Sequence, residues 1–244
     1  ESTIFSKGNT FSERNKLCYV GLYSDTLCDV LDIDYSGNPY RERLNDIQRC
    51  IDAHTILVGF NIKFDLHWIR NYGITFVDKR IWDCQLVHFI LTGQQNPYPS
   101  LNSVAAYYNL GSKLDVIASE YWKNGIDTSD IPKDLLEEYL DGDLKLTEQV
   151  YLKQLEEVEK ATPQLKRLIS LHNQDLLVLQ EMEYNGLLFD EEQSNILAKE
   201  LEEQIKKIDE IPFDFQRRRM SVVFEESDGQ HLLICKGAFE ELIH

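Results

Sequence analysis

The stretch that decides the fold runs from Thr55 to Tyr72 and reads TILVGFNIKFDLHWIRNY. Its first part, Thr55–Phe60, is a short apolar run rich in β-branched residues, which is typical of a buried strand. From residue 61 the apolar positions recur every three to four residues, a period that predicts a helix over 61–72. A buried strand that leads directly into an amphipathic helix is the basic unit of an α/β protein.

The flanking sequence repeats this alternation. Leu17–Tyr23 and Leu27–Ile33 predict two strands joined by a turn, and helices are expected over 40–52 and 83–92. We therefore predict an α/β fold with a mixed sheet flanked by helices.

The predicted secondary structure changes twice in the rest of the chain. From Ser100 to about Lys207 the pattern is almost wholly helical, with Pro163 expected to open one helix and a charged helix over 191–207. Beyond it, Met220–Phe224 and His231–Cys235 predict a short C-terminal hairpin, followed by a helix over 238–243. We expect three regions, 1–160, 161–207 and 208–244.

Composition narrows the function classes. The 244 residues include 43% hydrophobic and 27% charged residues, which excludes a wholly disordered chain, a collagen and a coiled coil. The net charge of −17 disfavours general wrapping of nucleic acid but suits the binding of metal cations by clustered carboxylates. Five scattered cysteines without a CxxC pair disfavour structural zinc and are typical of free thiols in a reducing cytoplasm. Apolar runs are too short to span a membrane. Because the chain opens on Glu1 rather than Met, we expect it to be cut from something longer.

Asp65 occupies an apolar position of the helix predicted over 61–72. At 100° per residue it lies among large apolar side chains, whereas Lys63, His67 and Arg70 lie on the opposite face. The pattern therefore predicts that Asp65 points inward.

Asp143 has the same character in the helix expected from Lys133 to about Tyr151, while Asp141 points to the solvent side. A buried carboxylate needs a partner, and the partner of each aspartate is either a salt bridge or helix cap, or a shared divalent cation. Oxygen ligands without His or Cys clusters favour Mg²⁺ or Mn²⁺.

At these positions the sequence resembles a known family. Asn61–Asp65 (NIKFD) and Tyr139–Asp143 (YLDGD) resemble the second and third exonuclease motifs of proofreading family A DNA polymerases. Glu1–Thr3 (EST) matches the second half of the first motif, whose Asp would lie upstream of Glu1. The resemblance, closest to phage-type enzymes, covers about residues 1–205 and implies an RNase H-like sheet.

The resemblance implies a 3′→5′ exonuclease that acts on single-stranded DNA 3′ ends. Glu1, Asp65 and Asp143 would hold two Mg²⁺ or Mn²⁺ ions, which clamp the attacking and leaving oxygens, and Tyr139 would orient the water. Asn61 and Phe64 would contact the substrate. The polymerase domain is absent from this chain, and a monomer is expected.

Each role has a plainer alternative. Tyr139 could be a core aromatic residue, Asn61 the N-cap of its helix and Phe64 a packing residue. Glu1 is expected to be frayed and to bring its ammonium group beside the metal site, so the activity would be weak or lost.

The tail resembles a different family. Ile211–Val222 and Cys235–Ala238 resemble the nucleotide-binding domain of magnesium-transporting P-type ATPases, which implies that Lys236 and Gly237 line an adenine pocket. The triplet Arg217–Arg219 could instead be a basic patch for nucleic acid. Two unrelated pieces would then meet near 205–209.

Three functions therefore stand open. The main prediction is the exonuclease. The alternatives are a catalytically inactive remnant that binds single-stranded DNA and an ATP-binding fragment of a P-type ATPase.

Overall fold

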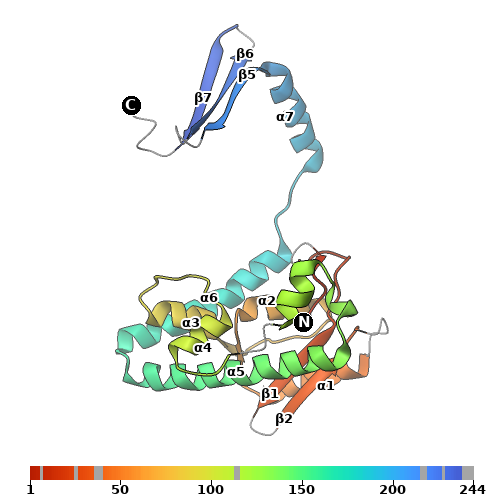
Figure 1. The fold of residues 1–244 in the computed structure, drawn as a ribbon, viewed down its shortest axis with the longest axis vertical. Coiled ribbons are helices and arrows are strands. Elements are labelled where there is room, and N and C mark those ends of the chain that lie inside the picture. Colours follow the sequence, from red (N-terminus) through yellow and green to blue (C-terminus); the bar gives the residue numbers. More distant parts are fainter. Residues whose placement is uncertain are drawn as a thin grey trace. The chain divides into compact units, whose positions relative to one another are not determined.

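A computed structural model describes residues 1–5, 8–24, 27–35, 41–112, 116–214, 219–226 and 229–237 (Figure 1). The chain divides into two compact units, unit 1 (Glu1–Gly186) and unit 2 (Leu187–His244). The boundaries expected at 160/161 and 207/208 concern which protein each segment resembles, and they stay predictions.

Unit 1 holds two small sheets. Strands β1 (Tyr19–Ser24) and β2 (Leu27–Asp32) pair antiparallel, and β3 (Ile56–Gly59) pairs in parallel with β4 (Arg80–Asp83). The predicted α/β class is confirmed, and β1, β2 and β3 lie within one to two residues of the expected bounds, whereas β4 was not predicted.

Helices flank both sheets. They are α1 (Arg41–Ala53), α2 (Ile62–Asn71), α3 (Cys84–Leu91), α4 (Leu101–Tyr107), α5 (Lys133–Lys160) and α6 (Pro163–Asn185), with short turns at Ile117–Tyr121, Trp122–Asn124 and Thr128–Asp130. Helix α5 contacts β1, β2 and β3, and α6 contacts α2, α3 and β4. The predicted start of α6 is confirmed, since Pro163 opens it and the Thr162 hydroxyl caps it by accepting from the Leu165 amide at 3.3 Å.

Gly21 explains how α5 lies so close to β1. A Cβ atom at this position would stand 2.5 Å from Cδ1 of Leu144 on α5. The absence of a side chain therefore allows the helix to pack on the strand.

The apolar core of unit 1 lies between these layers. One cluster joins α1 and α2 to the first sheet through Leu31, Ile47 and Leu66. A second surrounds Tyr19 and Tyr139, where α5 crosses that sheet.

The N-terminal residues extend the first sheet. The Glu1 ammonium donates to the Tyr19 carbonyl at 2.7 Å, and the Glu1 carbonyl accepts from the Cys18 and Tyr19 amides at 2.9 and 3.1 Å. Thr3 donates to the Lys16 carbonyl at 3.0 Å. The expectation of a frayed Glu1 was wrong, because these backbone hydrogen bonds hold it beside β1.

The described residues of unit 2 form α7 (Glu191–Gln204) and three strands, β5 (Ile205–Asp214), β6 (Arg219–Glu226) and β7 (His231–Gly237). The strands pair antiparallel in the order β5-β6-β7. The predicted hairpin is confirmed as β6–β7. The charged helix ends at Gln204, earlier than expected, because the chain enters β5. The helix expected over 238–243 lies outside the described residues.

In the described part of the chain, no helix is both long and apolar enough to cross a membrane.

Candidate functional sites

Asp65 lies on α2 beside the N-terminal segment. Its neighbours Ile62, Trp68 and Ile69 are buried as predicted, but the Asp65 side chain is exposed to solvent. The prediction that Asp65 points into the core was therefore wrong in part, because Asp65 reaches solvent although its apolar neighbours are buried.

The surroundings of Asp65 are nevertheless unusual for an exposed carboxylate. Protein atoms packed around the carboxyl desolvate it and raise its pKa to about 7, and the Glu1 and Asp83 carboxylates act in the same direction. The Glu1 ammonium opposes this rise. The Glu1 ammonium and carboxylate therefore both influence Asp65, while the shared site of Glu1 and Asp65 stays a prediction.

Asp83 joins the starts of two helices. Its buried carboxylate accepts from the amides of Asn61 (3.2 Å) and Ile62 (2.9 Å) at α2, and from those of Gln85 (2.9 Å) and Leu86 (3.1 Å) at α3. Burial raises the Asp83 pKa, while these four hydrogen bonds lower it. The sequence analysis assigned no role to Asp83, although Asp before a helix is a common N-cap signal.

Asn61 and Phe64 are both exposed on the first turn of α2. Asn61 holds the N-cap position in a left-handed conformation (φ 59°, ψ 45°) without a side-chain capping hydrogen bond. The alternative that Asn61 is the N-cap of its helix is confirmed for its position, although the Asp83 carboxylate supplies the acceptor in place of the Asn61 side chain. The Phe64 ring meets Trp68 edge to face, with centroids 6.4 Å apart.

The predicted residues of α5 have different environments. Tyr139 is 3% exposed and stands edge-on to Trp122 at 5.7 Å, inside the core cluster around Tyr19. Its interpretation as a core aromatic residue thus has direct support. Asp143 is half-buried, and Asp141 is half-buried too, paired with Lys145 at 2.6 Å.

The predicted two-ion centre is not confirmed. Among the described residues, no group of three or more His, Cys, Asp or Glu side chains is spaced to hold a metal ion. That Asp65 and Asp143 lie within reach of one ion stays a prediction.

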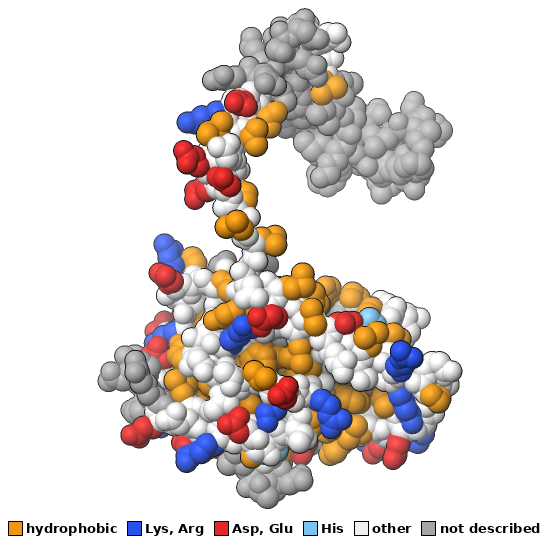
Figure 2. Space-filling view, turned by 180° about the vertical axis from the view of Figure 1, so that it is seen from behind, with side chains coloured by type: hydrophobic (Ala, Val, Ile, Leu, Met, Phe, Trp, Pro, Cys, Tyr) orange, Lys and Arg blue, Asp and Glu red, His pale blue; other side chains and the backbone are white. Residues whose placement is uncertain are grey.

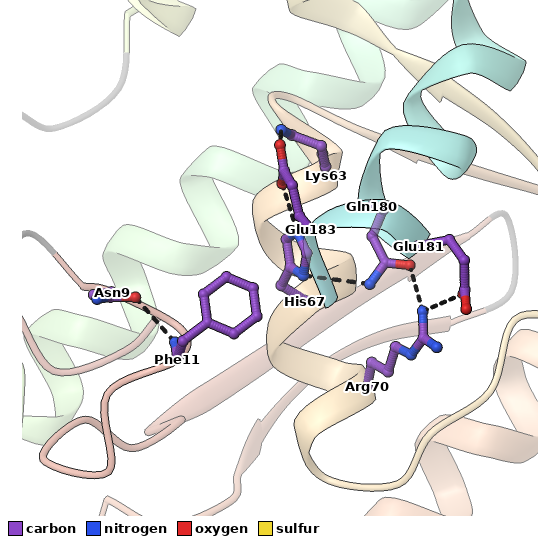
Figure 3. Close-up of polar contacts among 8 residues, drawn as sticks. All are labelled: Asn9, Phe11, Lys63, His67, Arg70, Gln180, Glu181 and Glu183. Carbon is purple, nitrogen blue, oxygen red and sulfur yellow. Dashed lines mark hydrogen bonds and ion pairs between the residues drawn. The ribbon is translucent and has the colours of Figure 1, made fainter. Parts of the chain in front are cut away.

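A polar network that the sequence analysis missed joins α2 to α6 (Figure 3). His67, expected on a solvent face, is 4% exposed because α6 covers it. Its Nε2 lies 2.8 Å from Glu183, whose pKa is lowered chiefly by a hydrogen bond from Lys63. No local sequence pattern predicts these contacts, because the partners on α2 and α6 lie over 100 residues apart in the chain.

In unit 2 the candidate residues lie at the end of β7. Lys236 pairs with Met220, and Gly237 pairs with Arg219 at the start of β6. Backbone pairing thus brings Lys236–Gly237 and Arg219 to one end of the sheet.

Comparison with known proteins finds similarity in the C-terminal part of the chain. A family model described as P-type ATPase, cytoplasmic domain N, matches residues 178–244. Proteins named "Magnesium-transporting ATPase, P-type 1" from Salmonella typhimurium (strain LT2) and Escherichia coli (strain K12) are each 55% identical over 47 residues. That match covers 19% of this chain and 5% of each relative, so the chain spans about a twentieth of their length.

These matches contradict the main functional prediction. The assignments as a 3′→5′ exonuclease, as part of a DNA polymerase and as a binder of single-stranded DNA 3′ ends were wrong, because the similarity found is to an ATPase domain. The DNA-contacting roles of Asn61 and Phe64 depended on these assignments and are no longer supported. On the described face in Figure 2, acidic and basic side chains of unit 1 are mixed, unlike the basic surface that DNA favours.

The resemblance of the tail is supported by both comparisons. Residues 178–244 are similar to the cytoplasmic N domain of P-type ATPases, and this range includes the predicted segments 211–222 and 235–238.

Proposed function

We propose that the C-terminal part of this chain is an ATP-binding fragment of a P-type ATPase nucleotide-binding domain. The observation that carries the proposal is the 55% identity over 47 residues to magnesium-transporting ATPases, within the family match over 178–244. Identity at this level over a continuous segment favours the same local strands and turns.

The end of β7 suits a nucleotide on chemical grounds. Gly237 has no side chain, so a flat adenine ring can approach the backbone there. Lys236, next to Gly237 at this end of β7, supplies a cationic group for phosphate oxygens. This end of the sheet would be a local anion site in a chain with a net charge of −17.

Mg²⁺ enters this proposal as the partner of the nucleotide. Mg²⁺ binds phosphate oxygens and keeps much of its water shell, so it needs no cage of protein carboxylates. The magnesium named in the relatives' titles describes those proteins.

Calorimetric titration of the full chain with ATP, with and without Mg²⁺, tests the proposal. Lys236→Ala should weaken binding roughly ten- to a hundred-fold, the loss of one charge-assisted hydrogen bond. Lys207→Ala, on β5 opposite Phe224, is the matched control and should bind as the unaltered chain does. Equal affinity of both variants, or no saturable binding, contradicts the proposal.

We further propose that Glu1, Asp65 and Asp143 bind a divalent cation in unit 1 by coming together around it, because without a cation the three carboxylates are not grouped. The raised pKa of Asp65 beside the Glu1 and Asp83 carboxylates supports it, because a cation would relieve this repulsion.

Titration with Mn²⁺, followed by electron paramagnetic resonance, tests the cation site. Asp65→Asn should weaken Mn²⁺ binding, whereas Asp141→Asn, at the neighbouring surface ion pair, should not. Binding that survives Asp65→Asn, or that both variants weaken equally, contradicts the site.

A further inference from the structure

The last two turns of α6 are attached to unit 1 almost without apolar burial. Val178 is 58% exposed, Leu179 44% and Met182 61%. The apolar anchors of α6 on the first core cluster stop at Leu176 and Leu177. From 178 to 186 only Gln180 is buried. Burial of apolar surface therefore contributes little to the position of this segment.

Polar contacts with α2 hold this segment instead of apolar burial. We call this set the α2–α6 clasp, and its members are Lys63, His67, Arg70, Gln180, Glu181 and Glu183 (Figure 3). Glu183 accepts from Lys63 and from His67, and Arg70 pairs with Glu181 at 2.5 Å. The Arg70 guanidinium also lies 3.7 Å from the centre of the Tyr184 ring.

The hydrogen bonds of the clasp have one consistent direction. Arg70 donates to the carbonyl oxygen of Gln180 at 3.0 Å, so the amide NH₂ of Gln180 faces His67 Nδ1 at 3.3 Å. With Nδ1 as the acceptor, Nε2 is the nitrogen that donates to Glu183 at 2.8 Å. Arg70 and Glu183 each contact two other members of the clasp, so the contacts form one connected network.

We propose that the clasp is a salt-releasable latch for the C-terminal end of α6. Glu181 and Glu183 have side chains 55% and 42% exposed, and ion pairs of this kind are weak and screened by salt. Because no apolar burial backs them up, residues 178–186 open as a local unit while 163–177 stay folded. The latch therefore lies where the chain leaves unit 1.

Hydrogen–deuterium exchange of the full chain, read by mass spectrometry, measures the latch directly. Raising NaCl from about 0.02 to 0.5 M, which shortens the screening length severalfold, should lower the protection of 178–186. The expected loss is roughly two- to five-fold for each pair screened. Protection of 163–177 should not change. A segment 178–186 whose exchange ignores salt overturns the proposal.

Two variants separate the latch from general salt effects. Glu183→Gln removes the charge shared by Lys63 and His67 but keeps the Arg70–Glu181 pair, so its protection at low salt should fall part of the way toward that of the unaltered chain at high salt. The control Asp141→Asn breaks the surface pair with Lys145 on α5 and should leave 178–186 unchanged.

Exchanging the two charges, Lys63→Glu with Glu183→Lys, is a second test of whether this ion pair holds the segment. The single Lys63→Glu variant should release the segment, and the double variant should restore part of its protection. A double variant that is no better protected than Lys63→Glu also overturns the proposal.

Discussion

At the scale of the residue, Asp65 makes the stability of unit 1 depend on pH. Its pKa in the folded chain is raised to about 7, above its ordinary value of 3.8, so the folded state holds a proton that the unfolded state has lost. The stabilisation is fully present below pH 3.8 and is lost as the pH rises through about 7. We expect Asp65→Asn to be more stable than the unaltered chain at pH 8 but not at pH 4.

Urea unfolding at both pH values measures this difference. Asp141→Asn serves as the control, because its surface pair contributes at most about 0.5 kcal/mol at either pH. If the stability of Asp65→Asn depends on pH as that of the unaltered chain does, the pKa of the Asp65 carboxyl is not raised by folding.

His88 predicts the opposite dependence. It is 7% exposed on α3, its Nδ1 has no hydrogen-bond partner, and burial lowers its pKa below the ordinary value of 6.5, although Glu157 acts against this. The unfolded state then binds the proton more readily, so the stability is full above pH 6.5 and falls as the pH drops below it. His88→Phe, which keeps a ring against Tyr107, should lose less stability between pH 7 and pH 5.

The half-exposed His172 provides the comparison for that measurement. His172→Gln should keep the full loss of stability between pH 7 and pH 5, as judged from urea midpoints. If His88→Phe and His172→Gln lose equal stability, the buried ring is not the cause.

At the scale of the element, Asp83 caps two helices with one carboxylate. Asp83→Ala leaves four amides at the starts of α2 and α3 without their acceptor, in a buried site. We expect a loss of about 2–4 kcal/mol in the free energy of unfolding, measured in urea. Ser100→Ala, which removes the cap of α4 alone, should cost only about 1 kcal/mol. Equal costs would mean that the bridge between α2 and α3 adds nothing.

Local signals explain which elements the sequence predicts. Apolar period, Pro163 and the turn near Gly229 identified α2, α6 and the β6–β7 hairpin, because these signals act within a few residues. Strand β5 was missed because its sequence, IKKIDEIPFD, carries charges that suit a helix, and it becomes a strand by pairing with β6.

The candidate sites depend more on contacts between distant residues. The pattern put Lys63, His67 and Arg70 on one polar face correctly, but nothing local shows that α6 covers that face. For Asp65, helical period gave the apolar neighbours, while its electrostatic surroundings come from Glu1 and Asp83, 64 and 18 positions away (65 − 1 and 83 − 65). Such partners are fixed by tertiary packing, which a single sequence does not specify.

At the scale of the whole molecule, the two units should differ in independence. The buried members of every core cluster in the described residues lie between Leu17 and Ile169, and their partly buried neighbours end at Leu177. A chain that ends at Gly186 therefore keeps the core of unit 1 and the α2–α6 clasp. We expect its melting temperature to stay within about 2 °C of the main transition of the full chain, since 1 kcal/mol shifts a unit of this size by ~2–4 °C.

Residues 187–244 should behave differently when produced alone. A segment of about 60 residues buries too little surface to be reliably stable, so we expect no cooperative thermal transition in calorimetry. Limited digestion with chymotrypsin can prepare both parts from the full chain, because Leu187, Leu188 and Phe189 are 95%, 105% and 72% exposed. ATP should induce a cooperative transition in 187–244 but leave that of 1–186 unchanged, because a ligand stabilises only the part that binds it. A melting temperature of 1–186 more than about 5 °C below that of the full chain would show that residues 187–244 contribute to its core. Stabilisation of 1–186 by ATP would show that the nucleotide binds in unit 1.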